Sequence, residues 1–113
     1  MNDQAIVVLI TAPSQEIARV IATALLEQKL AACVNVLPGI HSYYTWKGKT
    51  QEDQEVLLFV KTRLSLLERY LIPAVRAVHP YELPEIIALP IQAGLEGYLK
   101  WIEEETKPVN GEQ

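Results

Sequence analysis

Hydrophobic positions recur at every second residue in some segments of the chain and at every third or fourth residue in others. These spacings are the periods of β-strands and of α-helices. The segments with strand character are 5–11, 32–46, 55–61 and 85–91, and those with helix character are 14–25, 65–78 and 95–105. The pattern therefore predicts the element order β-α-β-β-α-β-α.

Local signals indicate where these elements begin, turn and bend. Ser65 and Glu68 have the spacing of a capping box at the start of the second helix. Pro73 lies inside that helix and predicts a kink, because proline lacks an amide hydrogen. Pro38-Gly39 interrupts the strand 32–46 and predicts a bulge or bend. Lys47-Gly48-Lys49 predicts the turn that joins this strand to the next one.

The first six elements match the ferredoxin-like plait, an α+β fold in which two helices cover one face of a four-stranded antiparallel sheet. The C-terminal helix is an addition, which is expected to bury Leu95, Leu99 and Ile102. At this length we expect one domain, residues 1–107, followed by a disordered tail, 108–113. This fold hosts many unrelated activities, so it does not by itself indicate a function.

The two middle strands form a hairpin that is long for so small a domain. Residues 32–46 alone would span about 50 Å at about 3.3 Å per residue, which is more than two helices cover. The uncovered part carries Tyr43, Tyr44 and Trp46, an apolar patch that a lone subunit would leave in water, beside edges that invite pairing. We therefore predict an obligate symmetric oligomer, whose subunit number does not follow from the pattern.

Composition removes several classes of function. The formal net charge of −4 argues against a nucleic-acid binder, which needs a clustered basic face. The apolar run 5–10 is too short to span a membrane, and it follows Asp3 rather than basic residues, as a secretory signal would require. Cys33 is the single cysteine, which excludes an internal disulfide and fits a reducing cytoplasm.

The segment 79–86 concentrates candidate chemistry between two prolines. It carries an imidazole, a phenol and two carboxylates, from His79, Tyr81, Glu82 and Glu85. The prolines restrict the backbone, so these side chains are held in place. Such a segment is either a rigid connector between a helix and a strand or a preformed site for a cation or a small ligand.

Six short motifs also occur in order and with ordinary spacing between about Ile6 and Trp101. They are Thr11-Ala12-Pro13, Leu30-Ala31-Ala32-Cys33-Val34-Asn35, Pro38-Gly39-Ile40, Tyr44-Thr45-Trp46-Lys47-Gly48, Lys61-Thr62 and His79-Pro80-Tyr81-Glu82-Leu83-Pro84-Glu85. This combination resembles the CutA family of divalent-cation tolerance proteins.

The resemblance implies a ferredoxin-like subunit assembled as a homotrimer, similar in architecture to the PII signalling proteins. The family is associated with copper and other divalent ions, and in animals with handling of acetylcholinesterase. No agreed catalytic activity comes with it. We therefore expect a cytoplasmic, non-enzymatic protein of divalent-cation response and tolerance, with no required cofactor and with Cu²⁺ or another divalent cation bound weakly.

Three residues are candidate metal ligands. His79 and Glu82 lie three residues apart across the proline-stiffened corner, from which they can approach one ion from the same side. Cys33 is a soft ligand of the kind copper prefers, although a lone cysteine in an apolar strand is commonly a small buried hydrophobe. Tyr81 and Trp101 are candidate contacts for a small molecule in a cleft between subunits.

Two observations weaken the metal hypothesis. Enterobacterial members linked to copper carry a cysteine before Thr-Ala-Pro and a second histidine before His-Pro-Tyr, where this chain has Ile10 and Val78. A site with one histidine would be weak. His79 can instead cap the negative end of the preceding helix, with Tyr81 and Glu82 bracing the connector.

Two functional classes remain. The first is a trimeric binding or signalling module without catalysis, which takes a divalent cation or a small molecule in a cleft between subunits. The second is a weak enzyme that uses Glu82 or Glu85 as acid or base with His79 as partner. The sequence contains no Ser-His-Asp set, phosphate-binding glycine loop or closed zinc pattern, which favours the first class.

Overall fold

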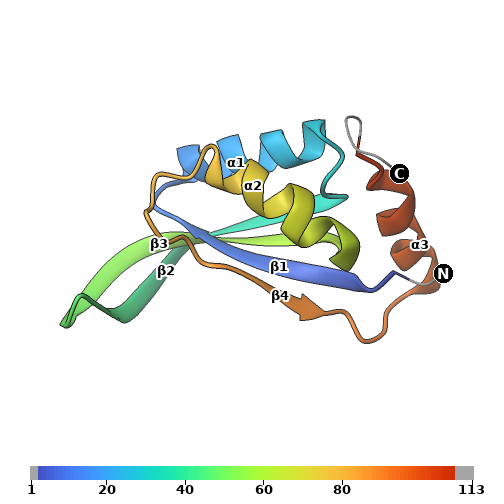
Figure 1. Ribbon diagram of the computed structural model, residues 1–113. Coiled ribbons are helices and arrows are strands. Elements are labelled where there is room, and N and C mark those ends of the chain that lie inside the picture. The colour runs from blue at the N-terminus through green and yellow to red at the C-terminus, as the bar shows by residue number, and fades with distance from the viewer. Residues whose placement is uncertain (1–2, 109–113) are drawn as a thin grey trace.

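The computed structural model describes residues 3–108 (Figure 1). Its strands are β1 (Ala5–Ala12), β2 (Cys33–Trp46), β3 (Lys49–Arg63) and β4 (Ile86–Pro90), and its helices are α1 (Gln15–Glu27), α2 (Ile72–Arg76) and α3 (Glu96–Glu105). The predicted order is confirmed, with β3 beginning at Lys49 rather than at Glu55. The predicted tail, 108–113, lies outside the described residues except for Pro108, which is buried.

The four strands form one antiparallel sheet in the order β2-β3-β1-β4. Both α1 and α2 lie on one face of this sheet, and α3 lies at the end away from the hairpin loop (Figure 1). Alternate residues of β1 and β3 point toward the helices, among them Val8, Ile10, Leu58 and Val60. Together with Ile21 and Leu25 of α1, they are part of the core. None of the helices within residues 3–108 is long and apolar enough to cross a membrane.

The hairpin extends beyond the rest of the sheet. Because β1 pairs with β3 only as far as Val56, residues 40–46 and 49–55 pair with each other alone. We call this two-stranded part the ribbon; Figure 1 shows it projecting past the helices. Tyr43, Tyr44 and Trp46 are 68%, 42% and 37% exposed on it. The long hairpin is thus confirmed, and the single chain leaves its aromatic patch uncovered.

The predicted bulge and turn are both present in the hairpin. The register shifts between Leu37 and Ile40, and Gly39 adopts a positive φ of 82° there. A two-residue turn joins the paired residues Trp46 and Lys49. Its residues Lys47 and Gly48 have φ values of 52° and 79°, as a type I′ turn requires.

The second helical segment begins differently from the prediction. The predicted capping box is wrong, because Ser65 lies inside the first turn, Leu64–Leu66, whose N-cap residue is Arg63. Ser65 instead donates its amide, at 3.2 Å, and its hydroxyl to the carboxylate of Asp3, a charged acceptor that forms stronger hydrogen bonds than a neutral one. The segment then runs through 3₁₀ and π-helical turns before α2, where Pro73 is the second residue. Pro73 therefore lies in the first turn of a short helix, where a missing amide hydrogen is tolerated, rather than in the interior of one long helix.

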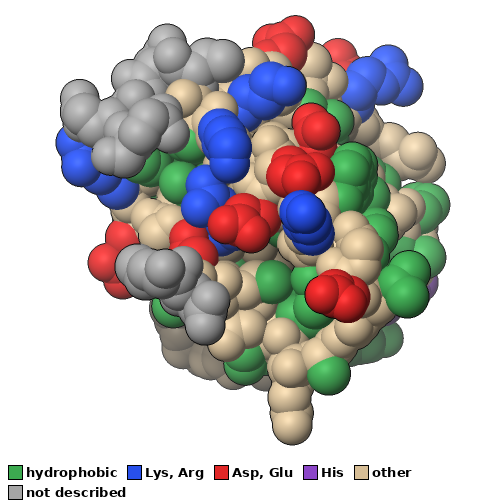
Figure 2. All heavy atoms as spheres, turned by 90° about the vertical axis from the view of Figure 1, so that its right-hand side faces the viewer, with side chains coloured by type: hydrophobic (Ala, Val, Ile, Leu, Met, Phe, Trp, Pro, Cys, Tyr) green, Lys and Arg blue, Asp and Glu red, His purple; other side chains and the backbone are tan. Residues whose placement is uncertain are grey.

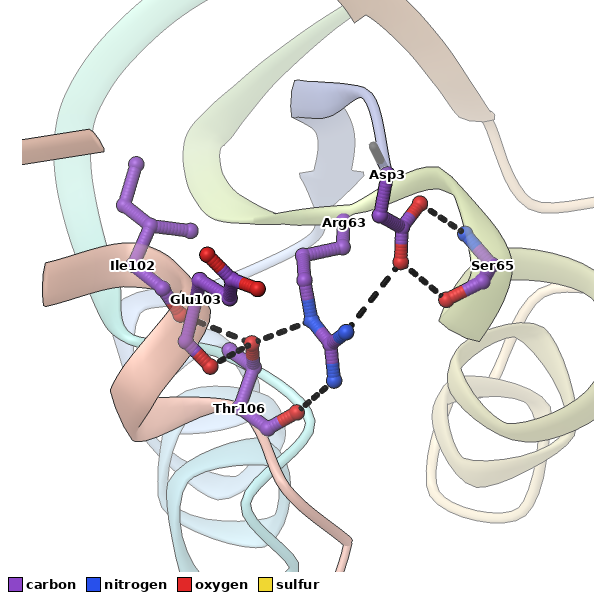
Figure 3. A network of polar contacts seen from close by, with 6 residues as sticks. All are labelled: Asp3, Arg63, Ser65, Ile102, Glu103 and Thr106. Atoms are coloured by element: carbon purple, nitrogen blue, oxygen red, sulfur yellow. Dashed lines mark hydrogen bonds and ion pairs between the residues drawn. The ribbon is translucent and has the colours of Figure 1, made fainter. Parts of the chain in front are cut away.

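The C-terminal helix is held against the sheet by one fully buried apolar residue and by a polar network (Figure 3). Ile102 is fully buried, as predicted, but Leu95 is 79% exposed, so its predicted burial is wrong. Leu95 is the N-cap of α3 and precedes the helical face. Arg63 donates from Nε to Thr106 Oγ1 at 2.8 Å, and it also donates to the Thr106 carbonyl and pairs with Asp3.

Candidate ligand-binding site

The connector 79–85 joins α2 to β4 without a helix or strand of its own. His79 is 8% exposed, and both of its ring nitrogens have partners. Nε2 donates to the Thr11 carbonyl at 2.7 Å, and Nδ1 accepts from the Tyr81 amide at 3.2 Å, which requires the hydrogen to be on Nε2. The amide of His79, not its ring, satisfies a carbonyl of α2, that of Val75. The ring therefore fastens the connector to the end of β1.

Tyr81 joins the connector to the hairpin. Its hydroxyl donates to Glu55 Oε2 at 2.7 Å, and its ring centroid lies 4.8 Å from that of His79. Glu55 is 7% exposed at the point where β3 leaves the sheet. Burial, followed by the hydrogen bond to Glu55, raises the pKa of Tyr81 well above its ordinary value of 10. The phenol thus stays protonated and donates a hydrogen bond to a buried carboxylate.

A second pair of a phenol and a carboxylate lies on the ribbon. Tyr44 donates its hydroxyl to Asp53 on the facing strand. This hydrogen bond, followed by burial, raises the pKa of Tyr44. The ribbon and the connector therefore present the same kind of pair, with each phenol hydroxyl already committed to an acidic acceptor.

A cavity of about 630 Å³ lies between the ribbon and the connector. Its walls carry three carboxylates and several aromatic rings, among them Glu55, Glu82, Glu85, Tyr44, Trp46 and Tyr81. This volume falls within the range of roughly 300–1,000 Å³ that small-molecule sites occupy. We call this space the acidic cavity.

The carboxylates of the acidic cavity have no cationic partner within residues 3–108. No lysine, arginine or histidine of this region lines it, and the ion pairs found there, Lys29–Glu105 and Arg63–Asp3, involve none of its residues. Burial, followed by the charge of Glu55, raises the pKa of Glu85. The carboxylates of the cavity therefore repel one another, and no positive side chain of the described residues offsets this repulsion.

Comparison with known proteins agrees with this architecture. A sequence model of the CutA1 divalent ion tolerance protein family matches residues 6–105. The chain belongs to this family. The divalent-cation tolerance protein CutA of Thermus thermophilus is 55% identical over 100 residues, which cover 88% of this chain and 96% of that protein. A solved structure of the divalent cation tolerance protein Cut A1 from Thermus thermophilus matches with a TM-score of 0.88 at 53% identity, covering 91% of this chain and 99% of the other.

Other CutA relatives differ in length and in compartment. The chloroplastic protein CutA of Arabidopsis thaliana is 50% identical over 102 residues, which cover 90% of this chain but only 56% of the plant protein. A structure described as the periplasmic divalent cation tolerance protein CutA of Archaeoglobus fulgidus matches with a TM-score of 0.87 at 44% identity, covering 91% of this chain and 99% of that one. These relatives therefore do not indicate one compartment for the CutA family.

The predicted site residues of this CutA chain do not all lie close together in space. Tyr81 and Glu82 line the acidic cavity. Cys33 lies at the first position of β2, where it pairs with Lys61 and contacts Tyr98 of α3. Trp101 is also on α3, at the end of the molecule away from the hairpin loop (Figure 1). Within one chain, Cys33 and Trp101 are thus separated from the cavity.

The arrangement also limits what one chain can offer a metal ion. Among residues 3–108, no group of three histidine, cysteine, aspartate or glutamate residues is placed to hold one. His79 has both ring nitrogens engaged, so a metal bond would have to replace one of these hydrogen bonds. Glu82 is exposed at the cavity and has no such commitment among the described residues. Of the three predicted ligands, Glu82 is the most available.

Sequence reasoning missed the acceptors on the hairpin, Glu55 and Asp53. Glu55 had one available signal: it stands directly before the apolar residues of the strand, in phase with Leu57 and Phe59. A carboxylate in such a position is unusual, because charged residues are seldom buried without a partner. Asp53 carried no comparable signal.

Proposed function

We propose that the chain works as a non-enzymatic, trimeric, PII-like module in the response to divalent metal ions, and that it binds its ligand at the acidic cavity. The observation that carries this proposal is the composition of that cavity. Among the described residues, its walls offer uncompensated carboxylates and aromatic rings but no histidine, cysteine or lysine. Such a lining suits the reversible binding of cations better than nucleophilic or acid–base catalysis, which needs a more complete set of groups.

The apolar surface supports an oligomer. Tyr43 on the ribbon is 68% exposed, and Ile87 and Leu89 on the edge strand β4 are about half exposed. They lie on a sheet face and a hairpin that α1 and α2 do not cover. Monomers seldom leave contiguous apolar surface and free strand edges in water. The subunit number, three, comes from the family resemblance.

Direct binding of copper or another divalent ion is expected to be weak. Cys33 and Glu82 lie at different ends of the folded subunit, so an ion that both residues bind has to lie between subunits. An ion that uses His79 has to replace its hydrogen bond with Thr11 or Tyr81. Either requirement lowers the affinity, because the cost of rearrangement is subtracted from the energy of the metal bonds.

Native mass spectrometry with and without Cu²⁺ tests this proposal. We expect a mass three times that of the 12.7 kDa chain and weak Cu²⁺ adducts that decrease in Glu82→Gln and Cys33→Ser. Glu103→Gln, an exposed change on α3, is the matched control and should bind as the native chain does. A monomer at all concentrations would contradict the trimer, and unchanged Cu²⁺ uptake in both variants would contradict the metal site.

The second candidate function is a weak enzyme that uses His79 and Glu82 in a cleft between subunits. It has one supporting observation, the nearness of an imidazole to an acidic cavity. The ring of His79, however, hydrogen-bonds backbone groups rather than a side chain that it could activate.

For the compartment we propose the cytoplasm, since the single cysteine fits a reducing environment.

A further inference from the structure

The chemistry of the acidic cavity defines the kind of molecule that fits it. We propose that this cavity binds a small organic cation of the guanidinium or alkylammonium class. The carboxylates of Glu55 and Glu85 supply the charge, and the rings of Tyr44 and Trp46 supply the apolar wall. This inference deepens the proposed function and rests on it in one respect: the cavity must stay open to small molecules in the assembled protein.

Glu55 is the first reason to expect a cation. It is more than nine-tenths buried and lines the cavity. Oε2 accepts from Tyr81, whereas Oε1 has no hydrogen-bond partner among residues 3–108. Nor is Oε1 among the sealed polar atoms of this region that lack a partner, so it is accessible to solvent on a side chain that lines the cavity. A buried carboxylate without a cation is costly, and a bound cation would offset that cost.

The surrounding charge is the second reason. Glu82 and Glu85 add two carboxylates to the walls, and no basic residue of the described chain lines them. The α3 end of the molecule is different, since acidic and basic side chains lie interspersed on it (Figure 2). A wall of one sign concentrates the field and attracts the opposite charge. The acidic cavity is thus selective for positive ligands.

Hydrogen bonding narrows the class further. The hydroxyls of Tyr44 and Tyr81 already donate to Asp53 and Glu55, so the phenols offer a ligand their rings and acceptor lone pairs. Together with the carboxylates, they make the walls rich in acceptors. Guanidinium and ammonium groups carry only donors. They also bind favourably over aromatic faces, because the electron-rich face of the ring attracts a cation.

A bare metal ion fits the same walls less well. It needs several ligand atoms within about 2.0–2.6 Å at once, and residues 3–108 contain no cluster of three candidate ligands. An organic cation spreads its charge over a larger volume and fills part of the 630 Å³ with carbon. It can therefore reach carboxylates that lie too far apart to share one ion.

Isothermal titration calorimetry with a matched pair of probes tests the inference. n-Butylguanidinium and n-butylurea have similar shapes and planar donors, but only the first is charged. We expect the native, assembled protein to bind n-butylguanidinium at least tenfold more tightly than n-butylurea. Glu55→Gln keeps an acceptor for Tyr81 and should weaken binding of the cation about tenfold. Glu85→Gln is the second variant if Glu55→Gln does not fold, and Glu103→Gln on α3 is the control.

The outcomes separate this inference from the proposed function. Equal affinity for the two probes, or native affinity in both cavity variants, would overturn the inference. Absence of binding by an intact trimer would also overturn it, because a neighbouring subunit would then fill the cavity. A monomer that still prefers n-butylguanidinium would support the inference while contradicting the trimer, so light scattering on the same samples is part of the experiment.

Discussion

Arg63 is predicted to fasten the C-terminal helix, and Arg63→Met is the change that tests this. The guanidinium donates to the side chain and the carbonyl of Thr106 and pairs with Asp3 at 3.2 Å (Figure 3). The Arg63 and Asp3 side chains are only 17% and 14% exposed. Methionine retains the packing of an unbranched stem and removes the charge and the donors.

The expected loss follows from these contacts. Hydrogen bonds to a charged group contribute about 1.5–3 kcal/mol each, and breaking a buried ion pair costs about 3–5 kcal/mol. Ser65 still donates to Asp3 in the variant, so we take the low end, about 3 kcal/mol. By comparison, burying Ile102, the only fully buried apolar residue of the described α3, contributes about 1.5–3 kcal/mol. The network at Arg63 is therefore as important to α3 as its apolar anchor.

Hydrogen exchange read by mass spectrometry is the direct assay. In Arg63→Met, peptides that cover residues 96–106 should exchange faster, whereas those from β1 and β3 should keep their protection, because α3 can detach locally. Arg19→Met, an exposed change on α1, serves as the control. Urea unfolding at one protein concentration gives the accompanying change in free energy.

A double-mutant cycle with Thr106→Val decides whether the contact itself is responsible. We expect a coupling of about 1–2 kcal/mol between the two side chains, because Thr106→Val removes the acceptor of the Arg63 Nε hydrogen bond but keeps the backbone carbonyl that accepts the other one. The reasoning is refuted if the two changes are additive, or if exchange across residues 96–106 is the same in Arg63→Met as in the native protein.

Three further predictions concern single side chains. The hydroxyl of Thr62 is buried without a partner in the described residues, so Thr62→Val should raise the free energy of unfolding by about 1 kcal/mol in a urea titration; a loss would mean that the hydroxyl has a partner. Gly39 has a positive φ and open space around its Cβ position, so Gly39→Ala should cost about 1 kcal/mol through the backbone alone, whereas Gly97→Ala in α3, also in open space, should not destabilise. The pKa of Glu85 is raised in the folded state from its ordinary 4.5, so its contribution to stability is full below about pH 4.5 and is lost as pH rises through the folded pKa. The free energy of unfolding of Glu85→Gln, measured relative to that of the native chain, should therefore increase as the pH rises from acidic to neutral. A difference between the two free energies that does not change with pH would contradict this.

The fold was accessible from the sequence because its elements follow local rules. The strand and helix periods depend on residues two to four positions apart, and the bulge at Pro38-Gly39 and the turn at Lys47-Gly48 depend on the residues that form them. The capping box failed for the opposite reason. Ser65 has the correct local spacing, but its hydrogen bonds go to Asp3, which is 62 positions away in the chain. A distant charged acceptor replaced the local interaction.

The candidate site was accessible only in part for the same reason. The segment from His79 to Glu85 is local and carries visible chemistry, so it could be singled out. What each side chain does depends on distant partners: Thr11 lies 68 positions from His79, and Glu55 lies 26 positions from Tyr81. These contacts make His79 an anchor of the connector and Glu55 the buried charge of the cavity. Spacing within the segment held no information about either role.

The bulge at Pro38-Gly39 links the fold to the chemistry of the cavity. Leu37 pairs with Leu57 and Ile40 pairs with Glu55, so β2 contains one residue more than β3 between these pairs. Side chains alternate between the faces of a strand, and a shift of one residue exchanges the faces. Beyond the bulge, paired residues place Ser42, Tyr44 and Trp46 on the face of Glu55 and Asp53. If the same residues paired regularly, without the bulge, that face would instead receive His41, Tyr43 and Thr45, and a basic imidazole would replace part of the aromatic wall. For this sequence, the bulged pairing therefore determines that the carboxylates meet aromatic rings rather than a potential cation.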